Sequence, residues 1–238
     1  MSVPERKAEP EGLIRSILAF DPSTDVVGIA LVSFCEDGSV HLRFAEAFDA
    51  TALEKAMTKE RKRTSPGDPM TSLERRVWRI REIRTWATQA VYRASQATGW
   101  ETVAMEWPNA RGAAPREALQ EVIGALFTVH HLAGMGIVPV TAAKAKTVWA
   151  KQEDHFRPTG SVAEDFGEKG RMVEWALQTF DLSHGHFGHH INIEMPGSLE
   201  AMADALGVAV AANSLLDERG RIKPPPAKRK KAKGKSNA

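Results

Sequence analysis

Short apolar runs, each bounded by polar or turn-forming residues, recur along the first two thirds of the chain. This pattern is typical of buried β-strands. The runs predict strands at residues 14–20, 26–34, 39–47, 102–106 and 137–140. Between the second and third runs, Glu36-Asp37-Gly38-Ser39 has the composition of a hairpin turn. The first three strands are therefore expected to form a meander.

Helical spacing of apolar residues dominates between and after the later strands. Thr71-Ser72-Leu73-Glu74 has the capping-box pattern of a helix start. Apolar residues recur after it at helical intervals, at Leu73, Val77, Ile80, Ala87, Val91 and Ala94. A second helix is predicted from Pro115 to about Gly134. Three more helices are predicted at residues 142–151, 168–180 and 198–216.

Residues 49–70 interrupt this regular pattern. They hold the charge run Lys59-Glu60-Arg61-Lys62-Arg63, followed by Pro66-Gly67-Asp68-Pro69. Closely spaced proline and glycine residues mark turns and loops. We therefore expect an irregular insertion near 49–70.

The order of the elements predicts the fold class. Three strands in a meander, followed by helix, strand, helix, strand and terminal helices, describe an α/β sheet with helices on both faces. A length of 238 residues with 42% apolar composition suits one domain with a sizeable core. We expect this domain at residues 14–217, between a disordered N-terminal segment at residues 1–13 and a disordered tail at residues 218–238.

Cysteine content and hydropathy restrict the compartment. Cys35 is the single cysteine, so an intramolecular disulfide is excluded and a reducing environment is expected. The segment from Met1 to Gly12 lacks the apolar stretch of about 7–15 residues that an export signal requires. No segment reaches the roughly 20 apolar residues that span a bilayer. We therefore expect a cytoplasmic protein without a membrane partner.

The net charge of +2 conceals a strongly basic C-terminus. The last fifteen residues carry six lysines and arginines and no acid, which leaves the rest of the chain near −4. These residues follow Pro224-Pro225-Pro226 and show no apolar periodicity, so we expect them to be disordered and available to a polyanion. Clustered basic residues favour nucleic acid, although a solubilising tail is the alternative. The expected DNA contacts are Lys228, Arg229, Lys230 and Lys231.

Three acidic residues stand out because each lies at the end of, or inside, an apolar segment. Asp21 closes the first strand, Glu106 closes Thr102-Val103-Ala104-Met105, and Asp204 interrupts a helix of small apolar residues. Burying unpaired carboxylates together is costly, so their convergence would imply bound cations. This is the outline of a metal-dependent phosphoryl-transfer enzyme. The alternative is a turn-capping Asp21, an edge-strand Glu106 and a solvent-facing Asp204.

With an Asp after the first strand, a Glu after the fourth and an Asp in the last helix, the chain resembles the RuvC family of Holliday junction resolvases, in the RNase H-like superfamily. The resemblance runs from about Ser16 to Asn213, and its most specific stretches are residues 20–28, 103–106 and 203–209. It implies an RNase H-like α/β fold, with a five-stranded mixed sheet of order 3-2-1-4-5 in which strand 2 is antiparallel.

The same resemblance implies a homodimer that makes Mg²⁺-dependent incisions in branched DNA and leaves 5′-phosphates. Two cations roughly 3.5–4 Å apart activate water and stabilise the leaving oxygen, and hard cations prefer carboxylate oxygens. We expect Asp21 to bridge two Mg²⁺ ions and Glu106 and Asp204 to hold one or the other, with Mn²⁺ as a substitute. Paired symmetric nicks would resolve a four-way junction. The dimer interface is expected on the helices at 72–97 and 115–134.

The chain departs from the family pattern at two positions near the acids. The family usually has an acid or a His three residues before the helix Asp, where this chain has Ala201. Glu200 lies one helical turn before Asp204 and is our candidate for the fourth ligand, although a first-turn Glu favoured by the helix dipole is equally consistent. The family's junction-wedging aromatic is not at its usual place. Trp107 stands directly after Glu106 instead, as a stacking or a core residue.

Basic residues flank the acids in the sequence. They are expected to contact DNA phosphates, with solvated surface charge as the alternative. They are Arg111, Arg116, Lys144, Lys146, Lys169 and Arg171. The loop from His184 to His190 holds four of the eight histidines and is either a plain polar loop or an aid to the active site.

Other functions stay open from the sequence. A RuvC-like nuclease can prefer flaps or forks over four-way junctions. A catalytically silent DNA-binding dimer is expected to have lost one of the three acids, and none is lost. An actin-like ATPase needs a second phosphate loop with paired glycines, which the sequence does not show.

Overall fold

The computed structural model describes residues 9–65, 67, 69–107, 113–129, 132, 135–150, 170–180 and 196–224. In this part of the chain, five strands form one sheet in the order β3-β2-β1-β4-β5. β2 is antiparallel to both β1 and β3, whereas β4 is parallel to β1 and β5. The fold class predicted from the sequence and the strand order implied by the resemblance are confirmed.

The strands begin and end within two residues of their predicted bounds. They are β1 Leu13–Asp21, β2 Val26–Cys35, β3 Val40–Asp49, β4 Thr102–Trp107 and β5 Ile137–Thr141. The helices are α1 Ala50–Thr64, α2 Ser72–Ala97, α3 Ala113–Phe127, α4 Ala142–Ala150, α6 Gly170–Phe180 and α7 Pro196–Leu215.

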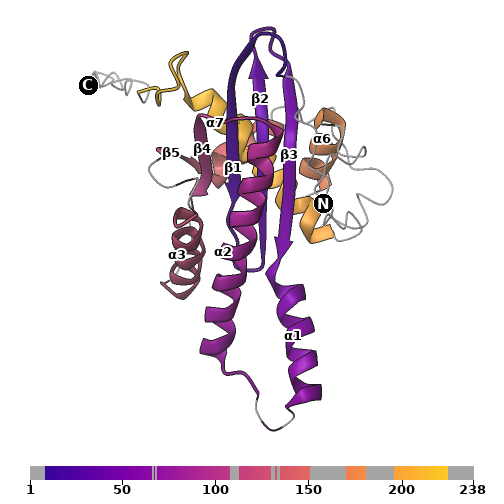
Figure 1. Ribbon diagram of the computed structural model, residues 1–238. Helices are drawn as coiled ribbons and strands as arrows, with labels where there is room; N and C mark the ends of the chain where they lie inside the picture. Colours follow the sequence, from indigo (N-terminus) through magenta and orange to yellow (C-terminus); the bar gives the residue numbers. More distant parts are fainter. Residues whose placement is uncertain are drawn as a thin grey trace, which may run out of the picture.

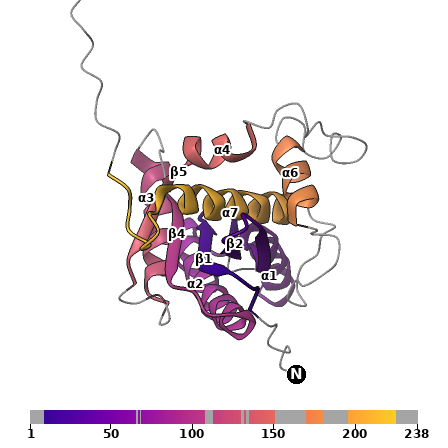
Figure 2. The same ribbon diagram turned by 90° about the horizontal axis from the view of Figure 1, so that it is seen from above.

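Helices cover both faces of the sheet (Figures 1 and 2). α2 and α3 lie on one face, and α7, α4 and α6 lie on the other. Alternation along β1 divides its side chains between the two layers, because Leu18 and Phe20 pack toward α2 while Ile17 and Ala19 pack toward α7. Of the helices described, none is both long and apolar enough to cross a membrane.

The expectation of an irregular insertion at 49–70 is wrong for most of that segment. Residues 50–64 form α1, whose N-cap Asp49 accepts a hydrogen bond from the backbone N–H of Ala52 at 2.7 Å. The charge run supplies Arg61, Lys62 and Arg63 to the last helical turn, where basic side chains complement the helix dipole. Only Ala50 of this helix is buried, so the apolar periodicity that identifies a packed helix is missing from the sequence.

α3 ends earlier than predicted. Its apolar spacing continues to Val129 and Leu132, which are both buried, but the helix ends at Phe127. Beyond that point the backbone N–H groups of Thr128 and Val129 bond to carbonyls three residues back instead of four. Such tightening is common at a helix end and preserves the burial pattern while closing the helix.

α7 crosses the sheet diagonally and approaches it most closely at Gly28 of β2. A Cβ atom on Gly28 would lie 2.0 Å from the carbonyl oxygen of Ala201, so only glycine admits the helix at this distance. At the N-terminal end of α7, Gly197 lies against Val26 of β2. Farther along, Gly207 lies against the backbone of Ala145 in α4, which follows β5. The helix therefore passes from β2 over β1 and β4 toward β5 (Figure 2).

Gly28→Ala is expected to destabilise the protein by about 1–3 kcal/mol, because α7 must move away from the sheet. For a chain of this size, thermal unfolding should shift down by several degrees, at about 2–4 °C per kcal/mol. Gly99→Ala is the matched control, since no atom lies within 4 Å of a Cβ at that exposed position. Equal melting temperatures for the two variants would contradict the close approach of α7.

Candidate active site

Asp21 and Glu106 lie side by side at one edge of the sheet. β1 and β4 are parallel, with Phe20 opposite Met105, and each acid is the next residue along its strand. Ala19 and Ala104, two residues before the acids, both pack in the α7 layer. Since side chains alternate along a strand, Asp21 and Glu106 also face α7. The carboxyl ends of strands in open α/β sheets are the usual position of active sites.

α7 brings Asp204 to the same region. Ala201 lies over Gly28, which is the β2 partner of Asp21, and Gly207 lies beside α4 next to β5. Asp204 falls between these two contacts, on the part of α7 that crosses β1 and β4. It is half-buried, as are Asp21 and Glu106. The three acids predicted from the sequence therefore lie in the same layer, toward the same end of the sheet.

Glu200 and Ala201 have different environments on α7. Ala201 is buried, with its carbonyl against β2, whereas Glu200 is half-buried one helical turn before Asp204. An acid at position 201 would lie between the helix and the sheet. Glu200 is thus the better placed of the two to accompany Asp204, and its role as a ligand stays a prediction.

Glu106 lies in an electrostatically distinctive position. Burial raises the pKa of its carboxyl group above the ordinary value, and the positive charge of Lys146 on α4 acts in the opposite direction. Lys146 itself is exposed, so its ammonium group is open to solvent while remaining within electrostatic range of Glu106. Perturbed carboxylates of this kind are more frequent at functional sites than elsewhere.

The donor chemistry of the acids fits a hard divalent cation, because all of the predicted ligands are carboxylates. In the ranges that the structure describes, however, no group of three or more His, Cys, Asp or Glu side chains forms a ligand cluster for a metal ion. The acids share one edge of the sheet without forming such a cluster. Metal binding by Asp21, Glu106, Asp204 and Glu200 therefore stays a prediction.

Two of the predicted DNA contacts lie on α4 and one lies on α6. Lys144 and Lys146 are exposed on α4, which packs against α7. Arg171 is exposed on α6, whose contacts are mainly with α7, α4 and β3. Arg116 lies on α3, but its side chain is not among those described. The remaining predicted contacts lie outside the described residues: Arg111, Lys169, Lys228, Arg229, Lys230 and Lys231. The loop from His184 to His190 also lies outside them.

Trp107, directly after Glu106, is not a core residue. Its side chain is 47% exposed although it is one of the largest apolar groups in the chain. Of the two interpretations from the sequence, core packing is therefore wrong. The indole is exposed at the end of β4 that carries Glu106, on the opposite face of the strand because side chains alternate.

Two features of the site were not recognised from the sequence. One is the role of Gly28, whose signal is a glycine inside an otherwise apolar strand. The other is Arg79 of α2, which donates to the carbonyl oxygen of Thr24 at 3.0 Å, to Asp25 Oδ1 at 3.1 Å and to Glu54 Oε2 of α1 at 3.0 Å. Arg79 thereby fixes the turn that follows Asp21. No local sequence pattern relates residues 25, 54 and 79.

No protein-family model matches this sequence, and no curated protein matches it. Solved structures do resemble the chain. RuvC from T. thermophilus in complex with a Holliday junction substrate has a TM-score of 0.50 and 14% identity, covering 83% of this chain and 92% of RuvC. T. thermophilus RuvC alone gives a TM-score of 0.49 at 15% identity, over 83% of this chain and 93% of RuvC. The yeast mitochondrial Holliday junction resolvase Ydc2 gives 0.43 at 12% identity, over 85% of this chain and 79% of Ydc2. At such identities the likeness to RuvC shows the RNase H-like fold.

The raised pKa of Glu106 predicts that its ionised form costs folding stability. The pKa of this carboxyl group is higher in the folded than in the unfolded chain, where it is near 4.3. The ionised group therefore destabilises the fold increasingly as the pH rises above about 4.3. Glu106→Gln should therefore raise the melting temperature at pH 8 in metal-free buffer by about 2–4 °C. The gain should shrink as pH falls toward 4.

Glu218→Gln, at an exposed position, is the control and should leave the melting temperature unchanged at both pH values. A melting temperature for Glu106→Gln at or below that of the wild type at pH 8 would show that the buried carboxylate is stabilised by its surroundings.

Proposed function

We propose that this protein is a Mg²⁺-dependent endodeoxyribonuclease that incises branched DNA, with four-way junctions as its main substrate. The observation that carries the proposal is the placement of Asp21 and Glu106 side by side on one face of the sheet. The helix that crosses this face, α7, carries Asp204. The RNase H-like fold shared with a RuvC whose structure contains a Holliday junction substrate supports it.

Asp21, Glu106 and Asp204 would hold the metal, with Glu200 as a fourth carboxylate. When bound, two Mg²⁺ ions supply an activated water for attack on the phosphodiester and charge stabilisation for the leaving oxygen. The carboxylates orient the site through their fixed places on β1, β4 and α7. We expect hydrolysis to leave 5′-phosphates.

Lys146 is suited to hold the scissile phosphate. Its exposed ammonium lies within electrostatic range of Glu106, so a phosphate near the acids would meet one positive side chain on α4. Contacts of this kind position the DNA backbone without reading the base sequence. The same charge offsets part of the cost of ionising Glu106 in its partly buried position.

Trp107 is suited to recognise the branch point. At a four-way junction the bases beside the crossover are easily unstacked, and an exposed indole offers them a stacking surface. The residue follows Glu106 on β4 and so projects from the other face of the strand, at the same end of the sheet as the acids.

Resolution of a junction requires two sites, so we propose that the active form is a homodimer. Paired nicks at symmetry-related positions follow naturally from a two-fold axis. α2 and α3 pack together and expose large apolar side chains, with Tyr92 57% exposed on the second half of α2 and Phe127 41% exposed on α3. A dimer through these helices should have twice the 26.1 kDa mass of the chain.

The first functional prediction concerns the three acids. Asp21→Asn, Glu106→Gln and Asp204→Asn should each reduce Mg²⁺-dependent cleavage of a four-way junction by at least about 100-fold, while junction affinity stays near that of the wild type. Neutral side chains bind the metal less well and repel phosphate less. Replacing Mg²⁺ by Ca²⁺ should likewise allow binding with little cleavage.

Glu218→Gln should cleave at the wild-type rate, as the control for removal of an exposed acid. Normal Mg²⁺-dependent cleavage by Glu106→Gln would exclude the proposed site, and equal cleavage of linear duplex and junction would exclude the proposed substrate.

The second functional prediction separates the two lysines of α4. Lys146→Gln should lower the single-turnover cleavage rate by about tenfold or more, as expected for loss of one charged contact to the reacting phosphate. Lys144→Gln removes the same charge from the same helix, at an exposed position for which no interaction with Glu106 is indicated, and should change the rate by less than about fivefold. Equal effects of the two substitutions would assign Lys146 to general DNA binding.

A further inference from the structure

α1 and the first half of α2 form a helical hairpin that extends beyond the sheet (Figure 1). α1 continues directly from β3, and α2 returns from the far end toward the sheet. β3 ends at Asp49, opposite Val26 of β2, and Gly28 of the same strand is opposite Asp21. The hairpin therefore extends from the end of the sheet that carries Asp21. We call residues 50–84 the α1–α2 arm.

The arm is basic in a chain whose remaining folded part is acidic. It contains ten lysines and arginines against five aspartates and glutamates, a net charge of +5. The whole chain has a net charge of +2, of which +6 lies in the last fifteen residues, so residues outside the arm and the tail carry a clear negative excess. A positive projection on an acidic body concentrates any polyanion at the arm.

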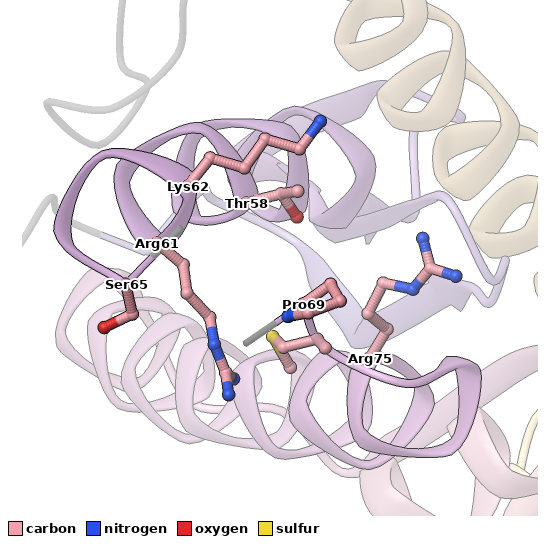
Figure 3. Close-up of a pocket in the computed structure, with 7 residues that line it drawn as sticks. Thr58, Arg61, Lys62, Ser65, Pro69 and Arg75 are labelled. Carbon is pink, nitrogen blue, oxygen red and sulfur yellow. The ribbon is translucent and has the colours of Figure 1, made fainter. Parts of the chain in front are cut away.

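A cavity of about 370 Å³ lies between the two helices toward the end of the arm (Figure 3). Arg61 and Lys62 line it from α1, and Arg75 lines it from α2. Thr58 and Ser65 add hydroxyl groups, which donate hydrogen bonds to phosphate oxygens. Among the described residues that line this cavity there is no carboxylate. Arg75 also pairs with Glu54, whose Oε1 lies 4.0 Å from its Nε and outside the cavity lining. The cations and hydroxyl donors of the lining itself match the chemistry of a phosphodiester.

The base of the arm is fixed to the turn that follows Asp21. The backbone N–H of Ala50 donates to the carbonyl oxygen of Asp25 at 2.8 Å. From the other helix, Arg79 contacts Thr24, Asp25 and Glu54, and so ties α1, α2 and the turn together. The side chains of Arg79 and Glu54 are mostly buried, where such ion pairs hold geometry better than exposed ones. The position of the cavity relative to Asp21 is therefore set by folded structure.

We infer that the α1–α2 arm holds the backbone of one duplex arm of the branched substrate, with the cavity at Arg61, Lys62 and Arg75 seating a phosphate. This rests on the proposed function, which places the cleaved phosphodiester at Asp21, Glu106 and Asp204. α1 has fifteen residues and is about 22 Å long at 1.5 Å per residue. A length of about 22 Å corresponds to about six base pairs of duplex at 3.4 Å per base pair. The phosphate seated in the cavity is therefore about six base pairs from the cleaved phosphodiester.

A second copy of the chain is a poorer occupant of the same surface. Two arms facing each other would bring together two groups of net charge +5, and like charges across an interface are unfavourable. A polyanion meets no such repulsion.

The test compares two double variants that each remove two positive charges. Arg61→Gln/Lys62→Gln changes the arm cavity, whereas Arg219→Gln/Lys223→Gln changes exposed residues beyond α7, where Arg15 near the start of β1 donates to the carbonyl oxygen of Asp217, at the opposite end of that strand from Asp21. Junction affinity is measured from 50 to 300 mM salt. The arm variant should reduce the log–log salt slope by about 0.9 per arm engaged, the value for one lost phosphate contact, and the control variant by less than 0.5.

Junctions with arms of different length locate the contact. With arms of 20 base pairs the arm variant should bind more weakly than the wild type, and with arms of four base pairs the two should bind alike, because the duplex then ends before the cavity. Lys62→Glu alone, at an exposed position, should reproduce the loss and provides a second variant if the double one is unstable.

The outcomes separate this inference from the proposed function. If the wild type binds and cleaves junctions but the arm and control variants have equal salt slopes, the inference is wrong and the function stands. It is also wrong if the arm variant changes the dimer mass and leaves DNA affinity unchanged. If the wild type does not bind branched DNA above linear duplex, the proposed function fails first.

Discussion

The close approach of α7 to β2 at Gly28 is the contact on which the site depends. A Cβ atom there would lie 2.0 Å from the carbonyl oxygen of Ala201, so the absence of a side chain sets how near the helix comes to the sheet. Asp204 and Glu200 are on this helix, and Asp21 is the strand partner of Gly28. A shift of α7 would move Asp204 and Glu200 relative to Asp21. A backbone contact without polar chemistry thus controls the geometry of the polar site.

The ionised carboxylate of Glu106 also costs the fold stability. Glu46 is as buried as any acid in the described chain, and it accepts hydrogen bonds from Trp86 Nε1 at 2.6 Å and from Arg93 Nε at 3.0 Å. Glu106, in contrast, has a pKa that burial raises, with Lys146 as a partial compensation. An acid with strong partners supports the fold, whereas an acid that is desolvated at the end of a strand is suited to binding a cation.

The sequence predicted most of the fold and named the acids of the candidate site, because both depend on local patterns. Apolar runs located the five strands, and carboxylates at the ends of two of them located Asp21 and Glu106. The sequence did not predict α1, since a helix with one buried residue carries no apolar stripe. It also missed the cluster of Asp25, Glu54 and Arg79, and the cavity at Arg61 and Arg75, because these bring together residues from separate elements. Metal ligation and the dimer remain predictions that rest on the resemblance.

The central claim is that two sites cut one junction in a coordinated way. It is tested most directly with a supercoiled plasmid that extrudes a cruciform, incubated with the wild-type protein and Mg²⁺. Two nicks across the branch within the lifetime of one complex convert the plasmid to a linear form, and sequencing of its ends should place the nicks at symmetry-related positions with 5′-phosphates. Accumulation of nicked circles without linear product would show independent cutting by single sites, and would contradict the account of a dimeric junction-resolving nuclease.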